Sequence, residues 1–222
     1  MEPVHTLDTR IAAKHLLDHP FYQRWNSGEL TRDELQDYAR QYYHYALAFP
    51  TFLSAMHHQT EDIAIRQMLL ENLIEEERGA ENHPELWLRF CDALGLSRDE
   101  VLATTASEAT RRLIDAVRES ARHGELHEGL AALYAYESQV PAVAQSKIDG
   151  LAKWYGITAD RDIAFFSVHM EADVVHSGTS KALLNQLCDT PAKTAAAGEA
   201  TSRTLDALYG FLDSVTMPAL VH

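Results

Sequence analysis

Apolar residues recur every three to four positions along almost the whole chain, which is the spacing of one face of an α-helix. Only 7 prolines and 10 glycines occur in 222 residues, so long segments run without interruption. No segment alternates apolar and polar residues as a half-buried strand does. The predicted helices cover residues 6–17, 31–58, 61–82, 107–122, 126–155, 160–187 and 191–217, with residues 18–28 as a connection and residues 84–94 as either a kinked continuation or a new helix.

Several helix boundaries have their own sequence signals. Thr31 and Glu34 have the spacing of a capping box and predict a helix start, and Pro50 is expected to kink the helix that follows. Thr190 and Pro191 provide an N-cap and a first-turn proline for the last helix. The sequence therefore predicts an all-α protein with an up-and-down style bundle.

The length and composition are those of a single globular domain, which is expected to span residues 1–222. The formal net charge of −14 argues against nucleic acid or an anionic membrane as a partner, because phosphates would be repelled. The two cysteines, Cys91 and Cys188, form no C-x-x-C motif and indicate no disulfide framework. The N-terminus lacks the apolar core of a secretion signal, and no stretch approaches the roughly 18 apolar residues of a membrane span. These features predict a cytoplasmic protein.

The stretch VHMEADVVH, residues 168–176, places three ionisable side chains in an apolar run. His169, Asp173 and His176 are four and three residues apart, so a helix presents them on one face. That face lies within the apolar sector of the helix rather than opposite it. Because desolvating a carboxylate is costly, Asp173 is expected to be paired or bound to a metal.

Two further predicted helices carry ionisable groups at apolar positions. In QMLLENLIEEERGAENHPELW, Glu76 takes a core position, and His83, seven residues on, lies only about 20° away around an ideal helix. Pro84 disfavours the α conformation at His83 and predicts a kink there. In GLAALYAYESQVPAVAQSK, Glu137 sits in the middle of the apolar stripe. Any one of these residues alone is more often a packed or solvated side chain than a ligand, but three helices agree.

Together the three helices offer three carboxylates and three imidazoles: Glu76, His83, Glu137, His169, Asp173 and His176. Two divalent metal ions need about six protein ligands if positions are kept open for oxygen or substrate. Mixed imidazole and carboxylate ligation suits iron or manganese better than structural zinc. The residues therefore predict a di-metal site.

The residues around these six positions resemble the CADD-like family, a branch of the haem-oxygenase-like di-metal oxidases. The resemblance rests on HPFYQRW, LIEEERGAENHPELW, LYAYESQVP and FFSVHMEADVVH, and it extends over essentially the whole chain. The combined pattern E-x6-H, E and H-x3-D-x2-H is specific, although no single part of it is. The resemblance implies a seven-helix haem-oxygenase/TenA-like bundle and a homodimer.

The resemblance also implies an activity. CADD-like proteins make para-aminobenzoate for folate synthesis, using dioxygen and a di-metal centre of iron with iron or manganese. The ring comes from a tyrosine of the protein itself, and a lysine is implicated as the donor of nitrogen. The matching residues here are Tyr22 in HPFYQRW and Lys147 in VAQSKIDG. A protein of this kind is consumed by its own reaction, so a single turnover per chain is expected, with an electron donor that the sequence does not identify.

Other functions stay open at this point. One is a di-metal oxidase that acts on an external fatty acid or amino acid, which would turn over many times on an added substrate. Another is a metal-free TenA-like or PqqC-like protein, although neither Cys91 nor Cys188 shares a stripe with the acidic cluster. A third is a non-enzymatic protein that docks partners or stores iron. Four more aromatic residues are candidates for lining a pocket or relaying electrons, with core packing as the ordinary alternative: Tyr43, Trp87, Tyr134 and Tyr136.

Overall fold

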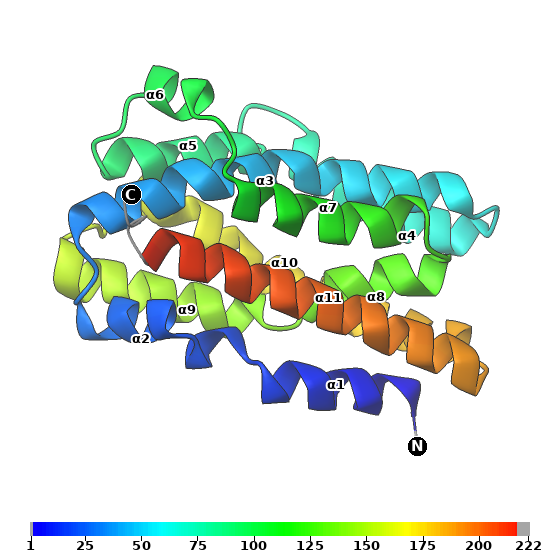
Figure 1. Ribbon diagram of the computed structural model, residues 1–222. Coiled ribbons are helices and arrows are strands. Elements are labelled where there is room, and N and C mark those ends of the chain that lie inside the picture. The colour runs from blue at the N-terminus through cyan, green and yellow to red at the C-terminus, as the bar shows by residue number, and fades with distance from the viewer. Residues whose placement is uncertain (1, 217–222) are drawn as a thin grey trace.

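Helices make up nearly all of the regular structure of the chain (Figure 1). The computed structural model describes residues 2–216, apart from the side chains of residues 171, 172, 174, 175 and 216. This part of the chain contains eleven α-helices and no strand, which confirms the predicted all-α fold. The elements are α1 Pro3–Ala13, the 3-10 turn η1 Leu16–Asp18, α2 Pro20–Ser27, α3 Arg32–Gln59, α4 Ile63–Glu77, α5 His83–Ala93, α6 Arg98–Ala103, α7 Glu108–Arg122, α8 Leu126–Glu137, α9 Val140–Gly150, the π-helical turn η2 Leu151–Tyr155, α10 Asp160–Leu187 and α11 Pro191–Thr216.

The three longest helices, α3, α10 and α11, organise the bundle. Helix α3 packs along α4, α5 and α7, whereas α11 packs along α7 and α8. In Figure 1, α3, α4, α5 and α7 lie in the upper half and α8, α9 and α11 in the lower half. Helix α10 packs against α5, α8 and α9, so it is in contact with both halves. This position allows α10 to present side chains toward residues of α4, α5 and α8.

The helix-start signals in the sequence are confirmed. The Thr31 hydroxyl accepts a hydrogen bond from the backbone N–H of Glu34, whose carboxylate accepts one from the Thr31 N–H. Helix α3 continues through Pro50. At the other end of the chain, the Thr190 hydroxyl accepts a backbone hydrogen bond from the first turn of α11, which begins at Pro191.

The connection predicted over residues 18–28 is wrong for most of its length, because helix α2 occupies this segment. The His19 side chain caps α2 by accepting a backbone hydrogen bond of 3.0 Å, and Pro20 has the fixed φ that suits a first turn. Gly28 ends the helix at a φ of 74°, a conformation that glycine adopts without strain. Tyr22 is therefore held on a helix rather than on a loop.

The single helix predicted over residues 126–155 is divided in two. Helix α8 ends at Glu137 and α9 begins at Val140. Pro141, in the first turn of α9, lacks the N–H that a continuous helix would direct to the carbonyl of Glu137. The haem-oxygenase/TenA-like bundle was expected to have seven helices. Because of breaks of this kind, the described chain contains eleven α-helices instead.

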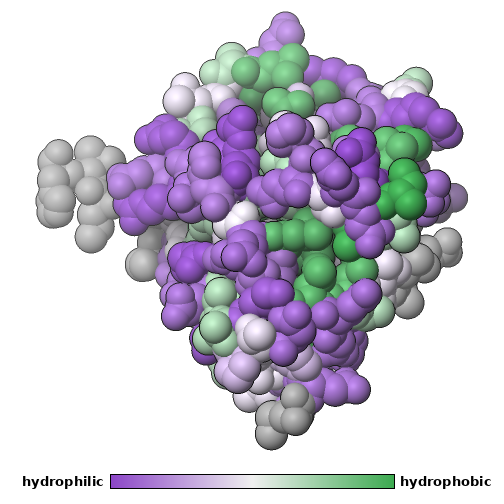
Figure 2. Space-filling model, turned by 90° about the vertical axis from the view of Figure 1, so that its right-hand side faces the viewer, coloured by the Kyte–Doolittle hydropathy of each residue, from purple (hydrophilic) through white to green (hydrophobic). Residues whose placement is uncertain are grey.

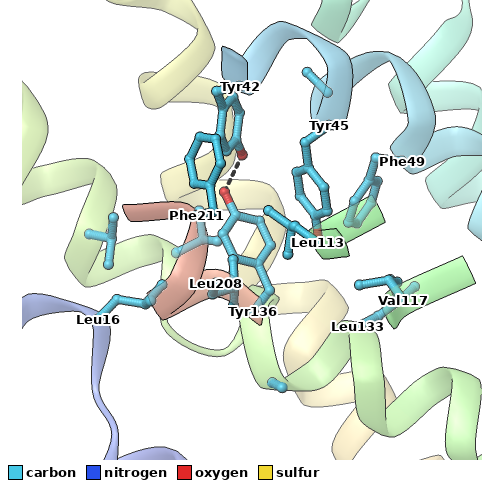
Figure 3. Close-up of a cluster of buried hydrophobic side chains, with 14 of the residues drawn as sticks. Leu16, Tyr42, Tyr45, Phe49, Leu113, Val117, Leu133, Tyr136, Leu208 and Phe211 are labelled. Carbon is cyan, nitrogen blue, oxygen red and sulfur yellow. Dashed lines mark hydrogen bonds between the residues drawn. The ribbon is translucent and has the colours of Figure 1, made fainter. Parts of the chain in front are cut away.

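A buried aromatic cluster fills the space between α3, α7, α8 and α11 (Figure 3). Tyr42, Tyr45 and Phe49 are three and four residues apart on α3, so they share one face of that helix. The hydroxyl groups of Tyr42 and Tyr136 form a hydrogen bond within the cluster (Figure 3). Apolar side chains from α7, α8 and α11 close around them: Leu113, Val117, Leu133, Leu208 and Phe211.

The surface is mainly polar. Figure 2 shows hydrophilic side chains over most of one face, with smaller hydrophobic areas between them. A chain with a formal net charge of −14 is expected to have such a surface. In the described part of the chain, no helix combines the length and apolar character needed to cross a membrane.

Candidate metal centre

The six side chains predicted as ligands come together in the interior as two groups of three. One group combines Glu76, His83 and His169, and the other combines Glu137, Asp173 and His176. Within each group, one ligand atom of every residue lies within 4.8 Å of the ligand atoms of the other two. Helix α10 contributes to both groups, because it packs against α5 on one side and α8 on another.

The first group depends on a turn that the sequence did not predict. The stripe through Glu76 and His83 was expected to lie on one helix, but α4 ends at Glu77 and His83 begins α5. Gly79, with a φ of 87°, turns the chain, and the Asn82 side chain caps α5. The turn brings Nδ1 of His83 to 2.8 Å from Oε2 of Glu76, and both side chains are buried. Their proximity therefore comes from the chain reversal rather than from a helical stripe.

His169 completes the first group with a fixed ring orientation. Its Nδ1–H donates a hydrogen bond of 2.6 Å to the carbonyl oxygen of Phe165, which leaves the lone pair on Nε2. Burial, reinforced by the nearby His83, lowers the pKa of His169 to about 3. A neutral imidazole with one nitrogen tied to a carbonyl is the usual form of a histidine ligand.

The second group lies where α8 ends against α10. Burial, followed by the charge of Asp173, raises the pKa of Glu137 to about 8. Burial likewise raises the pKa of Asp173, whose Oδ1 lies 3.7 Å from Nδ1 of His176. For His176, burial opposes the charged form, but the nearby carboxylates of Asp173, Glu137 and Glu75 outweigh it and raise the pKa. Without a cation, this group holds more negative charge than its buried surroundings favour.

The donor set fits two divalent cations. Nδ1 of His83 and Oδ2 of Asp173 are buried and have no hydrogen-bond partner among the described residues. Unpaired buried polar atoms are rare in folded proteins and need an explanation such as an ion. Three carboxylates balance most of the charge of two divalent ions, and the nitrogen and oxygen donors suit iron or manganese.

Two residues beside the second group were not identified from the sequence. The Asn72 side-chain amide donates to Oε1 of Glu137 at 3.4 Å, and Oε2 of Glu75 lies 3.1 Å from Nε2 of His176. Asn72 is four residues before Glu76 on α4, so its place on the same stripe was a signal that the sequence contained. Glu75 is half-exposed and gave no such signal.

A narrow cavity adjoins both groups. Its volume is about 10 Å³, which is room for a single water-sized molecule. Its lining combines metal-ligand candidates with aromatic and apolar side chains: Tyr42, Tyr45, Ala46, Phe49, Glu76, Tyr136, Glu137, Phe165, His169 and Asp173. A small, protected chamber beside two cation sites suits a diatomic gas better than a large organic substrate.

Only some of the aromatic residues that were expected to line a pocket are found at this cavity. Tyr136 lines the cavity. Trp87 does not line it but contacts the lining residue Phe165, with the two ring centres 4.7 Å apart. Tyr43 and Tyr134 do not line it, and the Tyr134 hydroxyl donates instead to Asp8 at 2.6 Å. The tyrosines of α3 that line the cavity are Tyr42 and Tyr45, which lie on the same face of that helix as Tyr38.

Tyr22 and Lys147 lie together in a second buried region, between α2, α3 and α9. Both side chains are 3% exposed, and Nζ of Lys147 lies 5.6 Å from the centre of the Tyr22 ring. The Lys147 ammonium donates a hydrogen bond of 2.7 Å to the Tyr38 hydroxyl. Burial lowers the pKa of Lys147 to about 7 and raises that of Tyr22. Neither residue belongs to the cavity lining.

Comparisons with known proteins match both the fold and the sequence. The profile of a family described as iron-containing redox enzymes matches residues 36–209. A 4-aminobenzoate synthase of Nitrosomonas europaea is 45% identical over 218 residues, covering 94% of this chain and 89% of the relative. A 4-aminobenzoate synthase of Chlamydia trachomatis is 42% identical over 212 residues, covering 96% and 91%. Among solved structures, a TenA homologue from Pseudomonas syringae superposes with a TM-score of 0.83 at 15% identity, over 96% of this chain and 91% of the other.

Proposed function

The chain belongs to the family of iron-containing redox enzymes with a haem-oxygenase-like fold, and from this premise we propose that it is a 4-aminobenzoate synthase. The proposal is supported by 45% and 42% identity to two proteins of that activity over nearly the whole chain. Metal ions bound in such a centre supply the activation of dioxygen. The chain itself supplies the ligands, the dry cavity and, in this proposal, the substrate.

We assign the six ligand candidates to two metal ions, either two irons or one iron and one manganese. One ion is held by Glu76, His83 and His169, and the other by Glu137, Asp173 and His176. The unpaired Nδ1 of His83 and Oδ2 of Asp173 support the assignment, as does the lone pair on Nε2 of His169. The surrounding aromatic side chains exclude water from these ligands, which strengthens their interaction with a cation.

The observation that carries the proposed reaction is a buried tyrosine beside a buried lysine that has no acidic partner among the described side chains. 4-Aminobenzoate has its nitrogen and its carboxyl carbon at opposite positions of the ring. Tyrosine has its hydroxyl oxygen and Cβ at the same two positions. Conversion of Tyr22 therefore requires replacement of the ring C–O bond by a C–N bond, cleavage of the bond between Cα and Cβ, and oxidation of Cβ to a carboxyl group with oxygen from dioxygen. Transfer of the nitrogen from a lysine also breaks the bond between its Cε and Nζ.

Lys147 is suited to donate that nitrogen. Its Nζ donates to the Tyr38 hydroxyl and lies 5.6 Å from the centre of the Tyr22 ring, so the amine is held beside that ring. A pKa of about 7 leaves a large fraction of the amine neutral near pH 7, and only the neutral amine is nucleophilic. Because the reaction consumes the side chains of Tyr22 and Lys147, each chain turns over once.

The size of the cavity favours this internal substrate over an external one. A pocket that accepts a ligand as large as a fatty acid holds about 300 Å³ or more, whereas the cavity at the metal centre holds about 10 Å³. A cysteine hydrolase of the TenA kind is also disfavoured. Cys91 and Cys188 are both buried away from the cavity, and burial raises the pKa of Cys91 to about 12, which suppresses its thiolate.

Labelling of the protein's own tyrosine tests the proposal. Protein expressed with ring-labelled tyrosine, loaded with ferrous and manganous ions and exposed to dioxygen and a reductant, is expected to release ring-labelled 4-aminobenzoate. Peptide mapping is expected to find the altered residue at position 22. Tyr22→Phe should release none, whereas Tyr155→Phe, a matched change that removes a hydroxyl bonded to the Leu30 carbonyl, should behave as wild type. Unlabelled product, or undiminished product from Tyr22→Phe, would contradict the proposal.

A further inference from the structure

The Tyr45 hydroxyl is buried and has no hydrogen-bond partner among the described residues. Tyr45 is 1% exposed, and its side chain lines the narrow cavity beside the metal-ligand candidates. Unpaired buried hydroxyl groups are rare in folded proteins, because each has lost its hydrogen bonds to water without a replacement. This hydroxyl therefore indicates a bonding partner that the described side chains do not provide.

Four aromatic neighbours fix the Tyr45 ring, so its hydroxyl is not free to turn toward solvent. The ring centre of Tyr45 lies 5.6 Å from that of Tyr42 and 5.7 Å from that of Tyr136. It also lies 6.1 Å from the ring centres of Phe49 and Phe52. Figure 3 shows Tyr45 between Tyr42 and Phe49. Such close packing holds the hydroxyl at one position beside the cavity.

The other polar side chains of the cavity lining are already engaged. The hydroxyl groups of Tyr42 and Tyr136 bond to each other, and the Nδ1–H of His169 donates to the Phe165 carbonyl. The remaining polar side chains of the lining are carboxylates, which accept hydrogen bonds and bind cations: Glu76, Glu137 and Asp173. Among the described lining residues, Tyr45 is therefore the phenol that is not engaged with the protein.

The Tyr45 hydroxyl lies within electrostatic range of both metal-ligand groups. Glu76 belongs to the first group and Glu137 to the second. Burial, followed by the charges of Glu137 and Glu76, raises the pKa of Tyr45. The cavity volume of about 10 Å³ holds one water-sized molecule. Such a molecule would be close to both cation sites and to the Tyr45 phenol.

We infer that the Tyr45 hydroxyl donates a hydrogen bond to the small molecule that occupies this cavity, which is dioxygen in the proposed function. The inference rests on the proposed function, because that function identifies the occupant as dioxygen. A fixed donor favours an occupant that gains negative charge on oxygen, as dioxygen does when it accepts electrons. The same hydrogen bond sets the direction in which the molecule lies in the cavity. Tyr45 is therefore a catalytic residue that takes no part in holding the metal ions.

Nitric oxide tests this hydrogen bond without turnover. It is a diatomic probe that binds ferrous ions, and its infrared N–O stretching band shifts when a donor bonds to it. Ferrous-loaded wild type, kept free of dioxygen, should show a band that moves in deuterium oxide. Tyr45→Phe should lose this isotope shift and bind nitric oxide roughly two- to tenfold more weakly. Tyr43→Phe is the matched control on the same helix, because Tyr43 does not line the cavity and its loss should leave the band unchanged.

The outcomes separate this inference from the proposed function. Identical bands in wild type and Tyr45→Phe overturn the inference, and wild-type 4-aminobenzoate in the same preparation leaves the proposed function intact. An isotope shift that Tyr45→Phe abolishes, without any wild-type 4-aminobenzoate, supports the hydrogen bond and overturns the proposed function. The absence of a nitric oxide band from metal-loaded wild type also overturns the inference, because the cavity would not admit a diatomic molecule.

Metal content and thermal unfolding distinguish the hydrogen bond from metal ligation and from packing. Tyr45→Phe should bind as much metal as wild type, and a lower metal content would mark Tyr45 as a ligand and overturn the inference. In metal-free protein the variant keeps the ring and removes an unpaired hydroxyl, so its Tm should equal or exceed that of wild type. A lower Tm would show that the hydroxyl has a partner within the fold, which also overturns the inference.

Discussion

Nδ1 of His83 lies 2.8 Å from Oε2 of Glu76, yet the two atoms lack the geometry of a hydrogen bond. Glu76 lies in the last turn of α4, and His83 is the first residue of α5. An imidazole and a carboxylate this close, with neither satisfied by the other, converge on a third group. A cation at that point fastens α4 to α5, so metal binding is coupled to the stability of the fold.

Metal loading is therefore expected to raise the melting temperature. A metal ion present at about 100 times its dissociation constant adds roughly 2.7 kcal/mol to the free energy of unfolding. For a chain of this length, each kcal/mol shifts Tm by about 2–4 °C, which gives a rise of roughly 5–10 °C. Calorimetry of metal-free and manganese-loaded protein, both without oxygen, measures the shift.

His83→Ala separates this effect from nonspecific binding. The variant should retain roughly half of the metal, because the second group is left complete, and its Tm shift on loading should shrink accordingly. His123→Ala is the matched control, since His123 is exposed at the end of α7. If His83→Ala binds as much metal as wild type, the ligand assignment is wrong.

The buried Lys147 predicts a rise of stability with pH. Its pKa is lowered from 10.5 to about 7 in the folded protein, so between these values the unfolded chain binds a proton that the folded chain does not. The free energy of unfolding therefore gains up to about 1.4 kcal/mol per pH unit from this group as the pH rises above 7. The gain is absent below pH 7, where both states are protonated.

Comparison with Lys147→Met isolates this contribution from the other titrating groups. Urea unfolding at pH 7 and pH 9 should show that wild type gains more stability than Lys147→Met over this interval. The variant should also be the more stable of the two at pH 7, because methionine fills the same space without a charge. Parallel pH profiles for the two proteins would show that Lys147 is not buried as described.

Most of the long helices could be predicted from the sequence because the signals that mark their boundaries are local. The capping box at Thr31 and Glu34 and the start at Thr190 depend only on side chains within one turn of the boundary. The start of α2 was missed because its cap is His19, a residue that rarely caps a helix. The break after Glu137 was missed because apolar periodicity continues across it, even though Pro141 marks the position.

The candidate ligands were recognisable for a different reason. Charged groups in an apolar stripe violate the helical pattern, and the three on α10 do so within one face. How they divide into two groups was not predictable, since the division depends on the turn between α4 and α5 and on the end of α8. The relation of Tyr22 to Lys147 was likewise inaccessible, because it depends on how α2 packs against α9.

Removal of the Lys147 amine should stop the reaction without removing the metals. Lys147→Met is expected to bind both ions and release no 4-aminobenzoate, since no other amine replaces the nitrogen beside Tyr22. Protein labelled at the side-chain nitrogen of lysine should transfer the label to the product, as mass spectrometry will detect. Lys153→Met is the control, because Lys153 is exposed and stacks on Trp154 instead. Full product yield from Lys147→Met would exclude Lys147 as the nitrogen donor.

The contact between α2 and α9 holds the reacting pair together, and Gly150 makes this contact possible. A Cβ at Gly150 would lie 2.5 Å from Cδ1 of Trp25, a fully buried ring on the same helix as Tyr22 whose indole N–H bonds to the Lys147 carbonyl. Gly150→Ala is therefore expected to destabilise the fold by about 1–3 kcal/mol and to lower the yield of 4-aminobenzoate as α2 shifts. Gly210→Ala is the matched control, because a Cβ added there would meet no described atom within 4 Å beyond its own stretch of helix, and alanine there should stabilise α11 by about 0.5–1 kcal/mol. Chemical denaturation and product assays on both variants measure the two effects, and a stable, fully active Gly150→Ala would show that this contact does not position Tyr22.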